Sequence, residues 1–152
     1  MKKVQIGVVG GRQVSNQILD FAFHTGQEIA KRDAVLVCGG MGGVMEAACK
    51  GAKEKGGLTV GILPTVHAQD ANSFVDVIIP TGMGLARNAL IVSASDGIVA
   101  IGGKYGTLSE MAFAKQMDKP LISLQSWTFD STYPQVQSPQ EAVRLLFDML
   151  LK

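Results

Sequence analysis

The sequence is poor in the features that mark secreted, membrane and nucleic-acid-binding proteins. Its 152 residues include two cysteines, too few for the disulfide framework of a small secreted domain. No apolar run approaches the roughly 20 residues that span a bilayer, and Met1–Val4 does not resemble the start of a signal peptide. The 14 basic and 13 acidic residues nearly cancel, without a block of like charge or an aromatic-rich basic stripe. We therefore expect a soluble, cytoplasmic protein that binds neither membranes nor nucleic acid.

Cysteine and histidine are also too sparse to predict a metal site. Cys38 ends an expected strand and Cys49 lies in the helix expected after it, so we expect buried thiols rather than metal or redox residues. His24 falls within an expected helix, and His67 falls in a polar loop with Asp70. Neither histidine has a partner at the spacing of metal ligands.

Apolar runs alternate with helical patterns along the whole chain. The expected strands span residues 4–9, 35–38, 58–63, 75–79, 98–101 and 121–124. The expected helices span residues 15–31, 44–55, 85–94 and 107–117, with a last helix from Ser138 and an irregular segment over 127–137. Strands that are apolar on both faces and separated by helices predict a covered parallel sheet. We predict one α/β domain over residues 1–152, with a Rossmann-like, doubly wound, mainly parallel sheet and helices on both faces.

Glycine-rich turns follow four of the expected strands. Because the carboxyl ends of parallel strands meet at one edge of the sheet, these turns should converge there. Glycine lets a ligand approach the backbone, and the free N–H groups at a helix start attract anions. We therefore predict a site for a nucleotide or another phosphate ester. Met45 stands where a dinucleotide fingerprint would place its last glycine, and Lys104 is not part of a P-loop.

Polar residues beside these turns are candidates for the ligand contacts. Arg87 and Asn88 follow the turn at Gly82, and the planar guanidinium of arginine suits a phosphate. Thr107 and Glu110 have the spacing of a helix capping box, as do Ser138 and Glu141 near the end of the chain. The glycines before Glu110 favour an additional functional role for that carboxylate. The full set of candidate ligand-binding residues is Gly10, Gly11, Gly39, Gly40, Gly42, Gly43, Gly82, Arg87, Asn88, Gly102, Gly103, Gly106, Thr107 and Glu110.

Two glycine motifs resemble those of a known superfamily. Residues 38–46 (CGGMGGVME) and 102–110 (GGKYGTLSE) are similar to the motifs of the superfamily that contains LONELY GUY cytokinin-activating phosphoribohydrolases, molybdenum cofactor carrier proteins and DNA-processing Rossmann domains. The resemblance covers nearly the whole chain. Some members carry a lysine decarboxylase label, which no residue pattern here supports.

Residues 81–88 (TGMGLARN) and 43–48 (GVMEAA) look more like the molybdenum cofactor carrier branch than the phosphoribohydrolases. The second motif has Ile101 in place of the enzymes' proline and one extra residue before Gly106. Asn88 stands where the enzymes have lysine, and Cys38 and Glu46 stand where they usually have glycine.

The resemblance implies two functions. One is the binding, as carrier or store, of a phosphorylated heterocycle such as molybdenum cofactor or a nucleotide, with no further cofactor required. The alternative is a nucleoside 5′-monophosphate phosphoribohydrolase, in which Glu110 would stabilise the oxocarbenium ion and Arg87 would orient the substrate. A domain that has lost its ligand and acts through partners is a third option. The resemblance also implies a homo-oligomer, a dimer or a tetramer.

Overall fold

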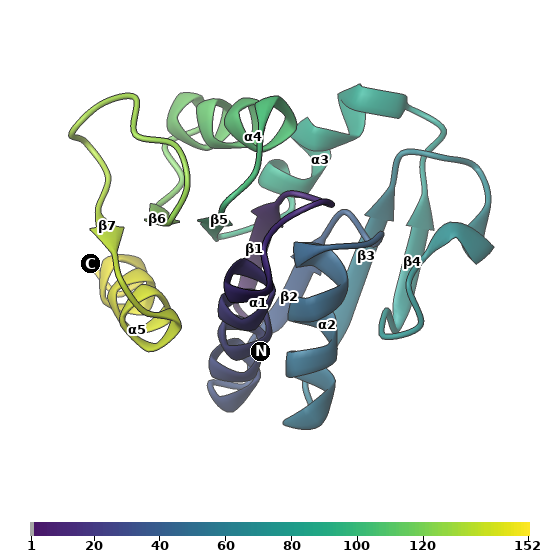
Figure 1. Cartoon of the computed structure of the whole chain (residues 1–152), viewed down its shortest axis with the longest axis horizontal. Helices are drawn as coiled ribbons and strands as arrows, with labels where there is room; N and C mark the ends of the chain where they lie inside the picture. Colours follow the sequence, from purple (N-terminus) through teal and green to yellow (C-terminus); the bar gives the residue numbers. More distant parts are fainter. Residues whose placement is uncertain (1) are drawn as a thin grey trace.

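The computed structural model describes residues 2–152 and contains one seven-stranded, all-parallel sheet (Figure 1). The strand order is β4-β3-β2-β1-β5-β6-β7. The strands are β1 Gln5–Gly10, β2 Val35–Cys38, β3 Thr59–Leu63, β4 Val77–Pro80, β5 Gly97–Ile101, β6 Leu121–Leu124 and β7 Gln135–Val136. The predicted α/β class and Rossmann-like topology are confirmed, and the sheet is parallel throughout.

Helices cover both faces of this sheet. The α-helices are α1 Asn16–Lys31, α2 Val44–Glu54, α3 Arg87–Ser93, α4 Tyr105–Gln116 and α5 Pro139–Leu150, and the short 3-10 helices are η1 Ala68–Asp70 and η2 Gly84–Ala86. Helices α1, α2 and α5 pack on one face, and α3 and α4 pack on the other (Figure 1). None of the helices described within residues 2–152 has the length and apolar character needed to cross a membrane.

Two hydrophobic cores sandwich the sheet because successive strand residues point to opposite faces. In β1, Ile6 and Val8 pack toward α1, α2 and α5, whereas Val9 packs toward α3 and α4. In β2, Leu36 and Val37 divide between the two cores in the same way. Burial on both faces explains why these strands read as continuous apolar runs.

The helix starts follow local sequence rules at both ends of the chain. The Ser15 hydroxyl caps α1 by accepting a hydrogen bond from the Ile18 N–H at 3.3 Å. Ser138 caps α5 in the same way, at 3.2 Å from the Glu141 N–H, and proline occupies the first turn. The segment expected to be irregular over 127–137 contains β7, a strand of two residues. This strand forms by pairing with β6, and no pattern in the local sequence predicts that pairing.

The order of the strands creates a crevice between β1 and β5. The chain leaves β1 toward β2, β3 and β4 on one side and returns to β5 on the other side. Gly10 and Ile101 are paired at the carboxyl ends of these two strands. The connections after β1 and β5 therefore diverge, and a ligand cavity in an open α/β sheet is expected at this point.

Helices α1 and α2 pack backbone against backbone at two glycines. A Cβ atom on Gly26 would overlap the carbonyl oxygen of Ala48, and one on Gly51 would overlap the carbonyl oxygen of Phe23. This close packing explains why a glycine lies inside helix α1. This contact fixes the position of α2 against α1. It therefore also fixes the glycine turn that leads into α2.

We expect Gly26→Ala to lower the free energy of unfolding by about 1–3 kcal/mol, because the added methyl group must push α1 and α2 apart. Thermal or urea denaturation measures this difference. Gly42→Ala is the matched control, since a Cβ atom there meets no atom within 4 Å and Gly42 has no positive φ. Equal stability of the two variants would contradict the packing described here.

Candidate functional site

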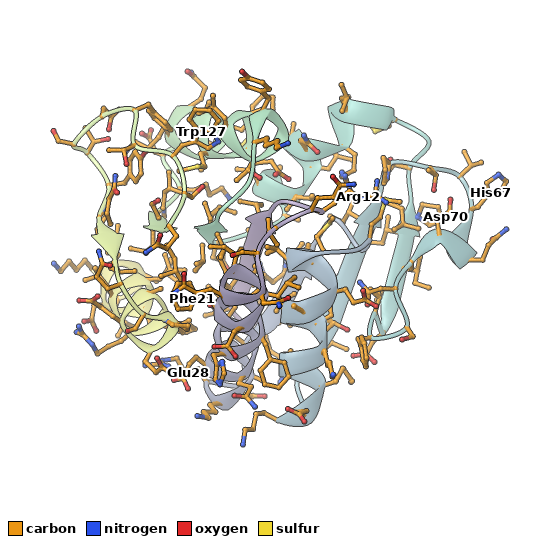
Figure 2. The ribbon with its side chains drawn as sticks, viewed as in Figure 1. Arg12, Phe21, Glu28, His67, Asp70 and Trp127 are labelled. Atoms are coloured by element: carbon orange, nitrogen blue, oxygen red, sulfur yellow. The ribbon has the colours of Figure 1, made fainter. Side chains whose placement is uncertain are left out.

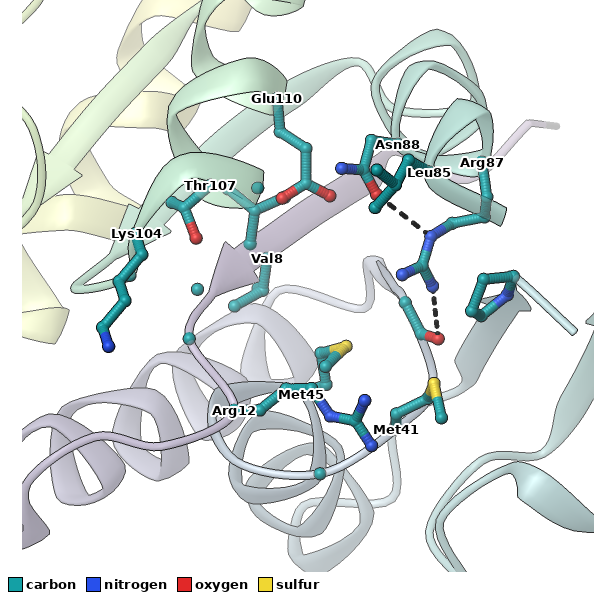
Figure 3. A pocket seen from close by; sticks show the side chains of 18 of the residues that line it. Val8, Arg12, Met41, Met45, Leu85, Arg87, Asn88, Lys104, Thr107 and Glu110 are labelled. Atoms are coloured by element: carbon teal, nitrogen blue, oxygen red, sulfur yellow. Dashed lines mark hydrogen bonds between the residues drawn. The ribbon is translucent and has the colours of Figure 1, made fainter. Parts of the chain in front are cut away.

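A cavity of about 920 Å³ opens at the carboxyl edge of the sheet, at the crevice between β1 and β5. Its walls come from the turns after β1, β2 and β5 and from the first turns of α3 and α4 (Figure 3). This volume is at the upper end of the range found for small-molecule and cofactor sites, roughly 300–1,000 Å³. The convergence of glycine turns expected from the strand order is therefore present, and it surrounds a space that a nucleotide could occupy.

The turns after β1 and β2 lie in direct main-chain contact. The Val44 N–H donates a hydrogen bond to the Gly11 carbonyl oxygen at 3.0 Å. Gly43 has a φ of +67°, and a Cβ atom there would lie 2.5 Å from the Arg12 Cα. Only glycine allows both the conformation and the approach. The two turns thus form one rigid floor for the cavity.

The carbonyl groups of the turn after β2 are already bound by polar side chains and main chain. Arg87 Nη1 donates to the Gly39 carbonyl at 2.8 Å. The Asn72 main-chain N–H donates to the Gly40 carbonyl, and Asn72 Nδ2 donates to the Met41 carbonyl, both at 2.8 Å. Asn72 was not among the candidate residues, although an asparagine in the long polar loop was the available signal. With its carbonyls held in this way, the turn can offer N–H groups to an anion.

Arg87 stabilises the main chain by hydrogen bonds and also places a positive charge at the cavity wall. Besides Gly39, its Nη1 donates to the Ile62 carbonyl at 2.7 Å, and its Nε donates to Asn88 Oδ1 at 3.2 Å (Figure 3). Within residues 2–152, Nη2 has no hydrogen-bond partner. Burial lowers the pKa of Arg87, and the nearby charges of Glu110 and Cys38 oppose that effect. One side of the guanidinium therefore ties β2 to β3 and the other remains available to a ligand.

The capping box expected at Thr107 is wrong. Helix α4 begins two residues earlier, at Tyr105, with Lys104 as its N-cap and without a capping side-chain hydrogen bond. Gly102 and Gly103 have φ values of +58° and +94°, which let the chain turn into the helix before Thr107 is reached. Glu110 consequently lies in the second turn of α4, where it cannot cap the helix, and its side chain lines the cavity.

The Glu110 carboxyl group is largely buried at the wall of the cavity. The residue is 7% exposed, and within residues 2–152 its side chain makes no hydrogen bond. Burial raises the pKa of Glu110 to about 8, and the positive charge of Arg87 offsets only part of this effect. The carboxyl group is therefore mostly protonated near neutral pH, so it can donate one hydrogen bond and accept others.

Two further cations line the cavity. Arg12 and Lys104 each follow a glycine pair directly, Arg12 after β1 and Lys104 after β5 (Figure 3). Both are exposed at the rim, and sequence reasoning assigned neither of them to the site. Their shared position after a glycine pair is the signal that could have found them. With Arg87 they make the cavity electropositive, which suits an anionic ligand.

The structure brings most of the sequence candidates together, but not all. The candidates that line the cavity are Gly10, Gly11, Gly39, Gly42, Arg87, Asn88, Gly103, Gly106, Thr107 and Glu110. Those that do not line it are Gly40, Gly43, Gly82 and Gly102, all with positive φ. These four shape the turns. His67 and Asp70 lie beyond β4, away from Arg12 and the cavity, and both cysteines are buried as expected (Figure 2).

The fold and the cavity together define the class of this protein, a Rossmann-like domain with a cavity at the switch point of its sheet. A family model described as the SLOG cluster4 family matches residues 3–148, and the chain belongs to that family. This agrees with the resemblance of the two glycine motifs to the superfamily of LONELY GUY proteins and molybdenum cofactor carriers.

Several known proteins are similar to this chain. The solved structure of the molybdenum cofactor binding protein from Rippkaea orientalis is 38% identical, has a TM-score of 0.93 and covers 99% of each chain. The molybdenum cofactor carrier protein of Chlamydomonas reinhardtii is 32% identical with a TM-score of 0.89, over 99% of this chain and 100% of that chain. A cytokinin riboside 5′-monophosphate phosphoribohydrolase of Mycobacterium tuberculosis is 31% identical over 73% of this chain and 64% of its own length.

The raised pKa of Glu110 predicts how stability depends on pH. The folded protein holds the proton up to about pH 8, whereas the unfolded chain releases it near the ordinary glutamate value. The contribution of the Glu110 proton to the free energy of unfolding is therefore complete below the ordinary glutamate pKa and is lost as the pH rises toward 8. The loss has a limiting slope of about 1.4 kcal/mol per pH unit.

Urea denaturation at several pH values between 5 and 8 measures this slope. Glu110→Gln should remove this component of the slope, and an unchanged slope in that variant would assign it to other groups.

Proposed function

We propose that this protein binds a phosphorylated heterocycle, such as molybdenum cofactor or a nucleotide, and carries or stores it. The observation that carries this proposal is a cavity wall that combines two parts, cationic glycine-rich turns and apolar side chains, with a protonated carboxyl group. A ligand with a phosphate at one end and a planar ring at the other would satisfy both parts. Such a ligand would be cargo, held without chemical change.

The phosphate would lie against the turns after β1, β2 and β5. Gly42 leaves open space in front of the backbone, because a Cβ atom there would meet no atom within 4 Å. The first turn of α4 adds N–H groups and the Thr107 hydroxyl. Arg12 and Lys104 would neutralise the phosphate from the rim.

The heterocycle would lie against the apolar part of the wall. Met41, Met45 and Leu85 line this side of the cavity, and methionine adapts its shape to a flat ring. Leu85 is 87% exposed, so its side chain is available to contact a bound ring. The protonated Glu110 carboxyl group would pair with ring nitrogen or oxygen atoms by donating and accepting hydrogen bonds.

Hydrolysis of a nucleoside 5′-monophosphate is the second candidate function. The phosphoribohydrolase of M. tuberculosis supports it by sequence similarity, and both Glu110 and Arg87 line the cavity as that reaction would need. The carrier proposal is favoured on two grounds. The molybdenum cofactor proteins match this chain over its full length, and a protonated Glu110 stabilises an oxocarbenium ion poorly.

Native mass spectrometry of the purified protein, followed by incubation with adenosine 5′-monophosphate, tests the proposal against its alternative. A retained phosphorylated ligand without release of adenine is the expected result. Steady release of adenine and ribose 5-phosphate that disappears in Glu110→Ala would overturn the carrier function and make the protein a hydrolase.

The same spectra give the subunit number. We propose a homo-oligomer, because apolar side chains of α4, of the residue that follows it and of the edge strand β4 are exposed. These side chains are Val77, Ile78, Ile79, Tyr105, Phe113 and Met117. A monomer at micromolar concentration would contradict this part of the proposal.

We expect Arg12→Gln to weaken the binding of adenosine 5′-monophosphate roughly tenfold, because it removes a charge-assisted contact with phosphate at an exposed position. Isothermal titration calorimetry measures the affinity, and the difference should shrink as salt is added. Arg144→Gln is the matched control, since Arg144 is an exposed arginine on α5 that does not line the cavity. An equal effect of the two variants would mean that Arg12 acts only through the net charge.

A further inference from the structure

The two cysteines lie against each other beneath the glycine turn that follows β2. Cys38 ends β2, Cys49 lies in α2, and their Sγ atoms are 3.5 Å apart. Both thiols are free and both residues are 0% exposed. The Gly40 N–H donates a hydrogen bond to Cys38 Sγ at 3.3 Å, so one thiol of the pair is also a structural partner of the turn.

The surroundings make the two thiols unequal. The hydrogen bond between the two thiols, the Gly40 N–H and the charge of Arg87 lower the pKa of Cys38, and burial and Glu110 oppose this effect. Burial and the neighbouring Cys38 raise the pKa of Cys49. Because the Gly40 N–H bonds to Cys38 Sγ and favours a negative charge there, Cys38 is the better nucleophile of the pair.

A bond between these sulfurs needs only a small displacement. A disulfide is about 2.05 Å long, so the two Sγ atoms must approach by roughly 1.5 Å. The bond would close a short loop, residues 38–49, which contains the whole turn after β2 and the start of α2. Closure would therefore act on the segment that forms the floor of the cavity.

We propose that Cys38 and Cys49 form a redox-reactive pair that a hydroperoxide converts into an intramolecular disulfide, and that this bond changes the turn carrying Gly39 to Gly43. The geometry of the pair carries the proposal. Because neither thiol reaches the surface, the oxidant must be as small as hydrogen peroxide.

The reaction balances in two steps. The Cys38 sulfur attacks one oxygen of hydrogen peroxide, the O–O bond breaks, and the other oxygen leaves as water, which leaves a sulfenic acid on Cys38. The Cys49 sulfur then attacks Cys38 Sγ, the S–O bond breaks, and a second water leaves. The two thiols lose two electrons and two protons, and the peroxide is reduced to two molecules of water.

The consequence for the cavity follows from the hydrogen bonds of the turn. Once bonded to Cys49, Cys38 Sγ is displaced and becomes a poorer acceptor for the Gly40 N–H. The Gly39, Gly40 and Met41 carbonyls remain held by Arg87 and Asn72, so the strain falls within the turn between Cys38 and Gly42. A lower affinity for a phosphorylated ligand after oxidation follows, and this part rests on the proposed function.

Peptide mapping tests the pair directly. Reduced protein is treated with hydrogen peroxide, quenched with catalase, alkylated with iodoacetamide under denaturing conditions and digested with trypsin. Arg32 and Lys50 bound one tryptic peptide that contains both cysteines. We expect this peptide to lose two hydrogen atoms, to resist alkylation and to recover both thiols after dithiothreitol. Two alkylated cysteines, or a sulfinic acid on Cys38 beside an alkylated Cys49, would overturn the proposal.

Single variants test the inequality of the two thiols. Cys49→Ser should leave a sulfenic acid on Cys38, which dimedone traps when the oxidised protein is unfolded in its presence. Cys38→Ser should leave Cys49 unreacted under the same conditions. Equal trapping in the two variants would overturn the assignment of Cys38 as the nucleophile. The wild-type mapping decides the disulfide even where a variant fails to fold.

Hydrogen exchange and ligand affinity test the effect on the turn. In the oxidised protein we expect faster amide exchange in peptides that cover residues 39–43 and weaker binding of adenosine 5′-monophosphate. Unchanged exchange would overturn the coupling of the disulfide to the turn. A disulfide that forms in a protein that binds no phosphorylated ligand would support the pair and refute the proposed function. Binding of a phosphorylated ligand by a protein that forms no disulfide would support the proposed function and refute the cysteine pair.

Discussion

The contact between the turns after β1 and β2 is the constraint on which the site depends. The Val44 N–H bonds to the Gly11 carbonyl at 3.0 Å, and a Cβ atom on Gly10 would lie 2.6 Å from Val44 Cγ1. A side chain at Gly10 would displace Val44 and so move the start of α2 away from β1. The packing of α1 against α2 at Gly26 also determines the position of α2, at a point farther along that helix. The cavity floor is therefore fixed by glycines at two distant places.

Much of the fold and the place of the site could be predicted from sequence because both depend on repeated, local patterns. Apolar runs revealed the strands, and Ser15 and Ser138 marked two helix starts. The glycine turns had to meet because parallel strands end at one edge. The start of α4 could not be predicted from its cap pattern, since Gly102 and Gly103 redirect the chain before Thr107. The role of Asn72 depends on contacts with the distant turn after β2, which spacing does not encode.

Arg87 connects the architecture of the sheet to the electrostatics of the cavity. Its Nη1 joins the ends of β2 and β3 through the Gly39 and Ile62 carbonyls. The same guanidinium stands close enough to Glu110 and Cys38 to act on the pKa of each. Arg87, which the sequence suggests only as a phosphate contact, therefore also stabilises the ends of β2 and β3. A loss of ligand binding after substitution of Arg87 would not by itself show that Arg87 contacts the ligand.

The charge of the ligand adds to the argument for holding rather than hydrolysis. Burial already raises the pKa of Glu110 to about 8. A phosphate bound among Arg12, Lys104 and Arg87 brings negative charge into the same cavity and would raise that pKa further, because a like charge disfavours ionisation. Binding of the phosphate therefore keeps Glu110 protonated. A protonated carboxyl group is well suited to pair with a heterocycle, whereas electrostatic stabilisation of an oxocarbenium ion needs an ionised carboxylate beside the ribose.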